Sequence, residues 1–177
     1  MTAITIQKQK VLILDVDGCL VPLQPIQTEN VTQEVIQKNT KLLRKARMPA
    51  KVHEWLLHEY FDYQWVVITG RKESLLGDVT RKLFDGIHKK VQFLFYPEEY
   101  SYASETYLQW KMHHFIAVPR VGCLTDVVYL EDDQQLLTRL QEHLFPCAVK
   151  IYTVSWEPTW APKLMFANVS KFQRNFC

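Results

Sequence analysis

Residues 11–20, VLILDVDGCL, decide the fold that the rest of the sequence supports. Four apolar residues lead directly into Asp15, and Asp17 and Gly18 follow. An apolar run of this kind predicts a buried strand, yet an isolated buried charge is costly. Two carboxylates at the end of such a strand therefore indicate either a turn, which Asp-Gly favours, or a binding site.

Length and composition predict one globular domain. The chain has 177 residues, of which 47% are apolar and 23% charged, and its net charge is +2. These values favour a single domain over residues 1–177 with a substantial core and argue against an extended basic surface for nucleic acid. No apolar run reaches the roughly 18 residues of a membrane span, and the first residues do not resemble a signal peptide.

The cysteines indicate a reducing compartment. Four cysteines are scattered along the chain without a Cys-x-x-Cys pair, so we expect neither a zinc site nor a disulfide framework. An intracellular, cytoplasmic location is the corresponding expectation.

Apolar runs alternate with helix-periodic stretches. Strands are predicted at 10–16, 65–70, 91–97, 126–133 and 148–155, and helices at 31–47, 52–60, 74–87, 101–115 and 133–145. Ser74 is expected to cap the third helix and Gly86 to end it. This alternation predicts an α/β fold, a three-layer Rossmann-like and mainly parallel sheet with helices on both faces. We expect no large cap domain, a core over about 10–155, and an irregular tail around Trp156 and Trp160.

Polar side chains stand at the carboxyl ends of three predicted strands: Asp15 and Asp17, then Thr69, then residues 131–133. In a parallel sheet the carboxyl ends of the strands share one edge, where ligands bind. Carboxylates at close range repel one another unless a cation lies among them, and hard oxygen ligands favour Mg²⁺. The alternatives are an ordinary strand end at Thr69 and a helix N-terminus at residues 131–133, where acids suit the helix dipole.

A lysine falls on the apolar stripe of the helix predicted at 101–115. Leu108, Lys111 and Phe115 are separated by three and four residues, which places Lys111 on the face that should meet the core. A buried lysine requires a partner, and the acidic cluster with a bound phosphate is the natural one. The alternative is a lysine whose stem is buried and whose ammonium reaches water.

Taken together, these motifs resemble the haloacid dehalogenase superfamily of phosphotransferases. DVDG at 15–18 is similar to its first motif, and VVITG at 66–70 is similar to its second. Lys111 corresponds to the third motif, and VVYLEDD at 127–133 corresponds to the fourth. The resemblance extends over about residues 10–155.

The resemblance implies an Mg²⁺-dependent phosphatase with an aspartyl-phosphate intermediate. Asp15 is implied as the nucleophile, Asp17 as the general acid and base, and Lys111 as the catalytic cation. Mg²⁺ is implied to bind the Asp15 side chain, the Asp17 backbone carbonyl and Asp132. The fourth motif also fits other choices, so Glu131 or Asp133 remains an alternative to Asp132 as the metal ligand.

The second motif implies the substrate contacts. Thr69 and the backbone of Gly70 are expected to hold a phosphoryl oxygen, and Arg71 is expected to reach substrate phosphate or a neighbouring acid. A solvated loop position is the alternative for Arg71. Cys19 stands where most members of the superfamily have Thr, and we expect this change to tune activity.

A narrower resemblance concerns the substrate. TGRKES at 69–74 and ETYLQWKMHHF at 105–115 are similar to the phosphatase half of polynucleotide kinases, which implies removal of 3′-phosphates from DNA or RNA ends. No Gly-x-x-x-x-Gly-Lys-Ser/Thr stretch of a kinase half occurs. The aromatic residues Tyr96, Tyr100 and Tyr102 are candidates for stacking on a terminal base or for the core.

Other function classes remain open. They are a phosphatase for small molecules, such as a nucleotide or sugar phosphate, and a non-catalytic phosphate-binding regulatory module. A signalling receiver domain also combines aspartates, Thr and Lys, but in that fold the Lys comes last, whereas here an acidic cluster follows Lys111.

Overall fold

A single six-stranded sheet forms the centre of the molecule. The structure is a computed structural model that describes residues 9–22, 31–87, 90–118, 124–143, 145, 148–156 and 162–167. The strand order is β3-β2-β1-β4-β5-β6. The strands are β1 (Gln9–Leu14), β2 (Gln64–Thr69), β3 (Val91–Phe95), β4 (Leu124–Glu131), β5 (Val149–Trp156) and β6 (Pro162–Ala167). β1 to β5 pair in parallel, and β6 runs antiparallel to β5.

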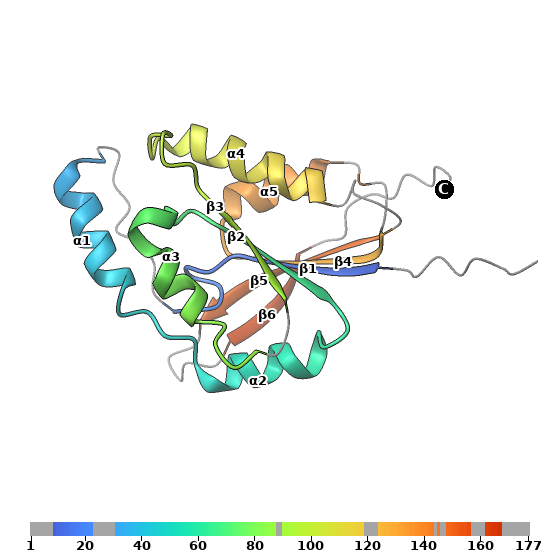
Figure 1. Cartoon of the computed structure of the whole chain (residues 1–177). Helices are drawn as coiled ribbons and strands as arrows, with labels where there is room; N and C mark the ends of the chain where they lie inside the picture. The colour runs from blue at the N-terminus through green and yellow to red at the C-terminus, as the bar shows by residue number, and fades with distance from the viewer. Residues whose placement is uncertain are drawn as a thin grey trace, which may run out of the picture.

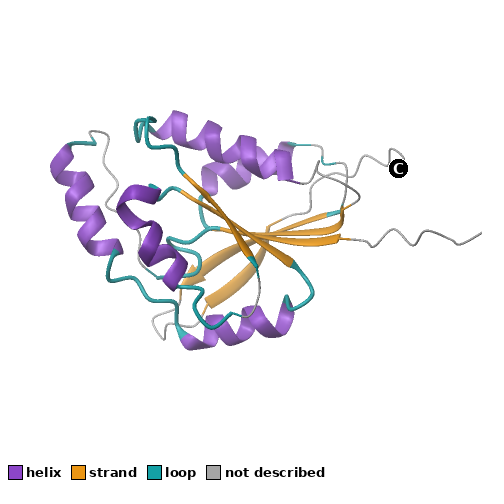
Figure 2. Cartoon of the chain, in the orientation of Figure 1, coloured by secondary structure: helices purple, strands orange, loops and turns teal. Residues whose placement is uncertain are grey.

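Helices cover both faces of this sheet, as Figures 1 and 2 show. They are α1 (Gln33–Leu43), α2 (Ala50–Glu59), α3 (Glu73–Lys82), α4 (Ser104–Ala117) and α5 (Gln134–Glu142). The α/β, Rossmann-like, mainly parallel fold predicted from the sequence is confirmed. Within the described part of the chain, no helix is long and apolar enough to cross a membrane.

Alternation along the strands separates two cores. In β1, Leu12 and Leu14 join the core under α2 and the end of α3, whereas Val11 and Ile13 join the core under α4 and α5. This follows from the strand geometry, because successive side chains point to opposite faces. Near-continuous apolar strands are therefore required, since both faces of a parallel sheet are covered.

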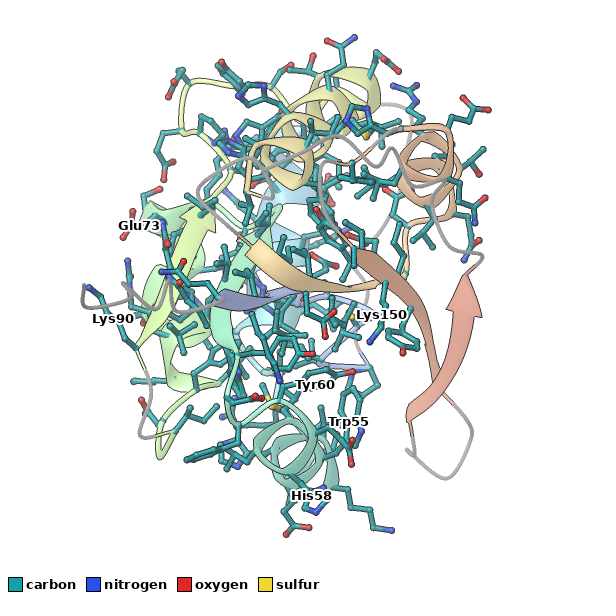
Figure 3. All side chains as sticks on the ribbon, turned by 90° about the vertical axis from the view of Figure 1, so that its right-hand side faces the viewer. Trp55, His58, Tyr60, Glu73, Lys90 and Lys150 are labelled. Atoms are coloured by element: carbon teal, nitrogen blue, oxygen red, sulfur yellow. The ribbon has the colours of Figure 1, made fainter. Side chains whose placement is uncertain are left out.

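The helix α2 illustrates how one face is buried. In the end-on view of Figure 3, Tyr60 lies between this helix and the sheet, whereas His58 points away from both. Tyr60 is buried, and its backbone carbonyl accepts a hydrogen bond from the Trp65 indole at 3.0 Å. The end of α2 is therefore fixed to the start of β2.

Several local predictions of helix ends and of the tail need correction. Ser74 does not cap α3: the helix begins one residue earlier, and the Ser74 backbone N–H and hydroxyl donate to Glu98 at 2.8 Å each. The first helix is shorter than predicted at both ends: Thr32 caps its start, its hydroxyl accepting from the Val35 N–H at 3.4 Å, and the helix ends at Leu43. The tail is not wholly irregular, since residues 162–167 form β6.

Gly86 does not end the helix α3, which stops at Lys82 with Leu83 as its C-cap. Gly86 lies in the turns that follow, with a positive φ of 83°. Cys19 is a buried free thiol. The other cysteines and Trp160 lie outside the described residues.

Candidate functional site

The acidic residue that follows β1 lies at the point where the strand order reverses. β1 is flanked by β2 on one side and β4 on the other, and such a switch point is where open α/β sheets bind ligands. The Asp15 backbone N–H donates to the Leu130 carbonyl at 3.1 Å, which fixes its position beside the end of β4. The Asp15 side chain is only 7% exposed.

A tight turn carries the chain away from Asp15. Gly18 has a φ of 80°, a left-handed conformation that favours glycine. Its N–H donates to the Val21 carbonyl at 3.0 Å, and the N–H groups of Leu20 and Val21 both donate to the Val16 carbonyl. The Asp-Gly pair therefore forms a turn, and that same turn holds both aspartates at the sheet edge.

Lys111 meets these acids from the helix α4. Its ammonium lies 3.2 Å from Asp15 Oδ1 and 2.8 Å from Glu131 Oε2, and its side chain is 1% exposed. The neighbours Leu108 and Phe115 on the same stripe are also buried. The predicted inward position of Lys111 is confirmed, and an ammonium reaching water is excluded by its burial.

Burial and charge shift the pKa values of this group. Burial raises the pKa of Asp15 to about 7, against the lowering effect of Lys111, and the charges of Glu131 and Asp17 raise it further. Burial disfavours the charge of Lys111, but Asp15 and Glu131 outweigh it and hold the pKa of Lys111 well above its usual value. The ammonium is therefore permanent, whereas Asp15 titrates near neutrality.

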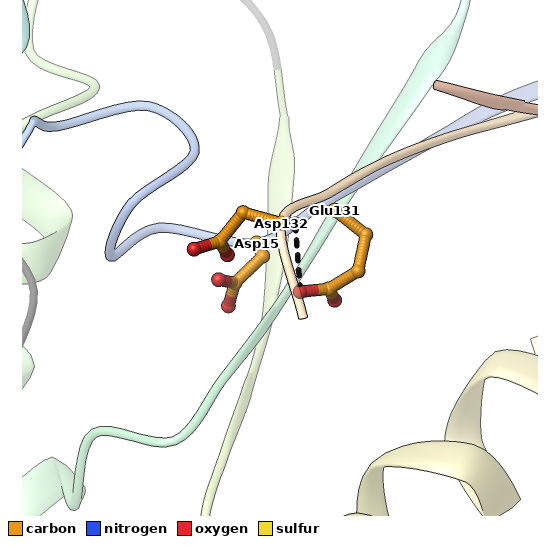
Figure 4. A group of neighbouring side chains, drawn as sticks. All are labelled: Asp15, Glu131 and Asp132. Atoms are coloured by element: carbon orange, nitrogen blue, oxygen red, sulfur yellow. Dashed lines mark hydrogen bonds between the residues drawn. The ribbon is translucent and has the colours of Figure 1, made fainter. Parts of the chain in front are cut away.

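Three carboxylates form a group that could hold a metal ion. One oxygen each from Asp15, Glu131 and Asp132 lies within 4.8 Å of the others (Figure 4). Both Glu131 oxygens are already engaged, because Oε1 accepts from the backbone N–H groups of Asp132 and Asp133 at 3.1 Å and Oε2 faces Lys111. Hard carboxylate oxygens suit a divalent cation such as Mg²⁺, and Asp15 and Asp132 are the better placed of the three.

The three acids at the end of β4 therefore have separate positions. Glu131 points inward to Lys111, Asp132 is half-buried beside Asp15, and Asp133 caps α5. The Asp133 carboxylate accepts from the N–H groups of Gln135 and Leu136. The helix N-terminus considered from the sequence is thus present, and it uses only the last of the three acids.

Arg71 is buried and pairs with Asp17. Its guanidinium Nη2 lies 2.6 Å from Asp17 Oδ1, its Nε lies 3.0 Å from Oδ2, and its Nη1 donates to the Thr80 hydroxyl at 3.1 Å. The Arg71 side chain is 1% exposed, so the solvated loop position is wrong. This bidentate contact fixes the orientation of the Asp17 carboxylate.

Thr69 and Gly70 complete the edge at the end of β2. Thr69 is fully buried, and its hydroxyl accepts from the Arg71 N–H at 3.3 Å. The ring of Tyr107 lies directly over Gly70, with its Cε2 2.8 Å from the place where a Cβ would stand. Tyr107 was not predicted from the sequence, although its position four residues before Lys111 places both on one helix face.

A cleft of about 420 Å³ lies beside this edge, between α1, the start of α3 and the segment before α4. Apolar atoms supply most of its lining surface, although most of the lining residues carry a polar group: Gln33, Ile36, Gln37, Thr40, Lys41, Lys72, Ser74, Leu75, Glu98 and Tyr102. The Lys72 ammonium is held by the carbonyls of Glu98 and Tyr100 and lies 4.9 Å from the centre of the Tyr102 ring. Sequence reasoning did not predict this cleft.

The aromatic candidates differ in exposure. Tyr96 is buried, and its hydroxyl donates to the Ser101 carbonyl at 2.7 Å, so it belongs to the core. Tyr102 is half-buried and stacks on Tyr96 with ring centres 5.5 Å apart. Tyr100 is 41% exposed and presents the most ring surface to solvent of these three.

Comparison with solved structures supports the fold. A chain in the structure of the Pnkp1/Rnl/Hen1 RNA repair complex superimposes with a TM-score of 0.54 at 18% sequence identity. The match covers 86% of this chain and 47% of that one, so the protein spans about half the length of its structural neighbour. No protein-family model and no curated protein sequence matches the chain.

Proposed function

We propose that the protein is an Mg²⁺-dependent phosphatase of the haloacid dehalogenase type, acting through an aspartyl-phosphate on 3′-phosphates at nucleic-acid ends. The observation that carries this proposal is the group formed by Asp15, Lys111 and Asp132. It places a carboxylate, a permanent ammonium and a second acid together at the switch point of the sheet. A nucleophilic carboxylate needs these neighbours, because a phosphate monoester brings negative charge of its own.

The chain's own residues supply two displacements. An Asp15 oxygen attacks phosphorus, the bond from phosphorus to the ester oxygen breaks, and a proton from the Asp17 carboxyl goes to the leaving oxygen. In the second displacement Asp17 takes a proton from water, whose oxygen attacks the phosphorus, and Asp15 is released as a carboxylate with inorganic phosphate. Arg71 contacts both oxygens of the Asp17 side chain and so keeps it in one orientation, as the carboxyl that donates in the first step and as the carboxylate that accepts in the second.

The remaining residues bind charge. Asp15, Asp132 and the Asp17 backbone carbonyl are the groups that would hold Mg²⁺, which supplies neutralisation of the transferring oxygens when bound. Lys111 offsets the charge of Asp15 and of the phosphoryl group. Thr69 and the Gly70 backbone stand at the end of the neighbouring strand, where they would donate to a phosphoryl oxygen.

Two observations favour a nucleic-acid end as the substrate. The structural neighbour belongs to an RNA repair complex. The cleft beside the site, with Lys41 and Lys72 in its lining, has room for the nucleoside that carries the phosphate.

The test is a substrate panel measured by phosphate release. Oligonucleotides with a 3′-phosphate or a 5′-phosphate are compared with nucleoside monophosphates, sugar phosphates and p-nitrophenyl phosphate, each with Mg²⁺ and with EDTA. We expect turnover with Mg²⁺ only, the highest kcat/KM for the 3′-phosphorylated oligonucleotide, and loss of at least about 10³-fold in Asp15→Asn.

The outcomes separate the alternatives. Preference for a nucleotide or sugar phosphate indicates a small-molecule phosphatase with the same chemistry. Binding of inorganic phosphate without turnover of any ester indicates a non-catalytic phosphate-binding module. Turnover that is equal in Asp15→Asn and the natural protein contradicts the proposed nucleophile.

A further inference from the structure

The helix α4 brings a tyrosine into the same group as Lys111. Tyr107 lies one turn before Lys111, and its hydroxyl is within hydrogen-bonding reach of the ammonium. The ammonium lies 5.5 Å from the centre of the Tyr107 ring. Lys111 therefore has oxygen partners on three elements, namely Asp15 after β1, Glu131 in β4 and Tyr107 on its own helix.

The Tyr107 ring also occupies the space over Gly70. A Cβ at Gly70 would stand 2.8 Å from Tyr107 Cε2 and 3.1 Å from its hydroxyl oxygen. Real Cβ contacts are not this short, so the ring lies here because position 70 has no side chain. The hydroxyl is consequently fixed at the end of β2, next to the backbone that is proposed to bind a phosphoryl oxygen.

Packing holds the ring in this position. Its centre lies 5.5 Å from that of Tyr96, edge to face, and 6.5 Å from that of Trp110, nearly parallel. Tyr107 itself is half-buried, so one part of the ring is held by the core while another part remains accessible from solvent. A ring fixed on one side and open on the other is suited to contact a bound ligand.

The hydroxyl keeps its proton. Burial raises the pKa of Tyr107, and the charges of Asp15 and Glu131 raise it further, although Lys111 lowers it. An ammonium can only donate, so the Tyr107 oxygen accepts from Lys111 and its own O–H remains to donate. Among the residues that the structure describes, no acceptor is recorded for this O–H.

We propose that the Tyr107 hydroxyl donates a hydrogen bond to a non-bridging phosphoryl oxygen, beside the Gly70 backbone. Tyr107 is then a substrate-contacting residue of the site. This inference rests on the proposed function and adds a donor to it. A neutral O–H beside an ammonium suits an anion with several oxygens, because each donor can meet a different oxygen.

The test compares Tyr107→Phe with Tyr63→Phe. Both changes remove one hydroxyl from a half-buried ring, but the Tyr63 hydroxyl donates to Asp126 at 2.6 Å and belongs to the segment before β2, at the opposite end of that strand from Gly70. With the best ester of the substrate panel, we expect kcat/KM to fall about 10- to 100-fold in Tyr107→Phe, with the larger share in kcat. Tyr63→Phe should stay within about two-fold of the natural protein.

A second measurement is independent of turnover. Binding of inorganic phosphate in the presence of Mg²⁺ is measured by titration calorimetry for the natural protein and both variants. We expect Kd to rise about 10-fold in Tyr107→Phe alone, while circular dichroism and Tm remain close to those of the natural protein because the ring is retained.

These two readouts distinguish the possible failures. If no ester is hydrolysed but Tyr107→Phe still weakens phosphate binding, the proposed function is wrong and the Tyr107 contact stands. If esters are hydrolysed and Tyr107→Phe matches Tyr63→Phe in both rate and phosphate affinity, the Tyr107 contact is wrong. Absence of phosphate binding to the natural protein together with absence of turnover overturns both.

Discussion

Lys111 carries one positive charge between two acids, and all three side chains are buried. With Asp15 and Glu131 both ionised, the group holds one negative charge in excess. Where water is excluded, such an excess is relieved by a proton or by a bound cation. The pKa of Asp15, raised to about 7 by burial, reflects the first route. The second route is the one that a metal-dependent reaction uses.

Removing the ammonium should therefore cost stability in a pH-dependent way. Lys111→Met leaves Asp15 and Glu131 buried without a counter-charge, and we expect the free energy of unfolding at pH 8 to fall by about 3–5 kcal/mol. At pH 5 the loss should be much smaller, because without Lys111 both acids bind protons and become neutral. Urea denaturation at the two pH values measures the difference.

An exposed lysine provides the control for this change. Lys82 lies at the end of α3 on the surface, so Lys82→Met should change stability by less than about 0.5 kcal/mol at either pH. An equal loss at pH 5 and pH 8 in Lys111→Met would mean that lost packing, and not charge, dominates.

The titration of Asp15 also predicts how Mg²⁺ stabilises the protein. A carboxyl whose folded pKa is raised binds its proton more tightly in the folded state, so its contribution to stability declines as the pH rises from about 4 to about 7. A metal ion must displace that proton below pH 7 and meets an ionised Asp15 above it. An excess of Mg²⁺, about 10 mM, should raise the Tm. This rise in Tm should be larger at pH 8 than at pH 5.5.

Asp15→Asn is the matched variant, because it removes the titration and keeps the shape. In this variant the Mg²⁺-dependent rise in Tm should be small and nearly the same at both pH values. A larger Mg²⁺ effect at pH 5.5 than at pH 8 in the natural protein would contradict the assignment of Asp15 to the metal site.

At the scale of elements, periodicity predicted the strands well and the helix ends poorly. β1 and β4 carry apolar runs that only a doubly covered sheet accommodates, so their positions could be predicted. Ser74 has the composition of a cap, yet Glu98, which is distant in sequence, bonds its hydroxyl and N–H. Such tertiary contacts override local propensity and leave no signal in a short stretch of sequence.

The same contrast, between what local geometry predicts and what tertiary contacts decide, applies to the candidate site. Asp15, Thr69 and Lys111 could be placed together because strand ends and helix stripes have fixed geometry. The division of roles between Glu131 and Asp132 could not, because it depends on which of two adjacent side chains turns inward. Alternation along β4 decides this, and the register that sets the alternation is a property of the assembled sheet.

Gly77 in α3 and Gly86 in the turn after it provide a prediction at the scale of elements. Gly86 has a φ of 83° and open space where a Cβ would stand, so Gly86→Ala should lower the free energy of unfolding by about 1–2 kcal/mol through backbone strain alone. Gly77 lies inside α3, where a Cβ would meet only the flexible side chains of Arg81 and Glu73. Gly77→Ala should raise stability by up to about 1 kcal/mol.

Urea denaturation of both variants measures this contrast. Opposite signs are the expected result, and Gly86→Asn should lose less than Gly86→Ala because Asn tolerates the left-handed region. If Gly77→Ala loses as much stability as Gly86→Ala, crowding of the new Cβ against Arg81 and Glu73 decides the effect of Gly77→Ala.

At the scale of the whole molecule, the residues of the candidate site lie at one edge of the sheet. β1, β2 and β4 all end there, and α1 with α3 stands beside the same edge (Figure 1). The helix α1 buries little beyond Leu43 and contacts α3 through Leu76 and Val79. The helix α1 thus adds little to the core and forms one wall of the cleft.

Lys41 provides the test of that role. It is exposed on α1 and lines the cleft, whereas Lys45 is exposed after the end of the same helix and does not. If the cleft receives the strand leading to a 3′-phosphate, Lys41 lies where it can meet a backbone phosphate of that strand. Lys41→Gln should then raise KM for a 3′-phosphorylated oligonucleotide several-fold and reduce the slope of log(kcat/KM) against log[salt] by about 0.7.

Small esters lack the phosphate that Lys41 is expected to meet, so p-nitrophenyl phosphate should be hydrolysed equally by the natural protein and Lys41→Gln. Lys45→Gln makes the same change in net charge and should leave both substrates unaffected. An equal effect of the two lysine variants would indicate long-range attraction and not a contact in the cleft. No effect of either on the oligonucleotide would place the strand elsewhere, and the cleft would then have no part in recognising nucleic acid.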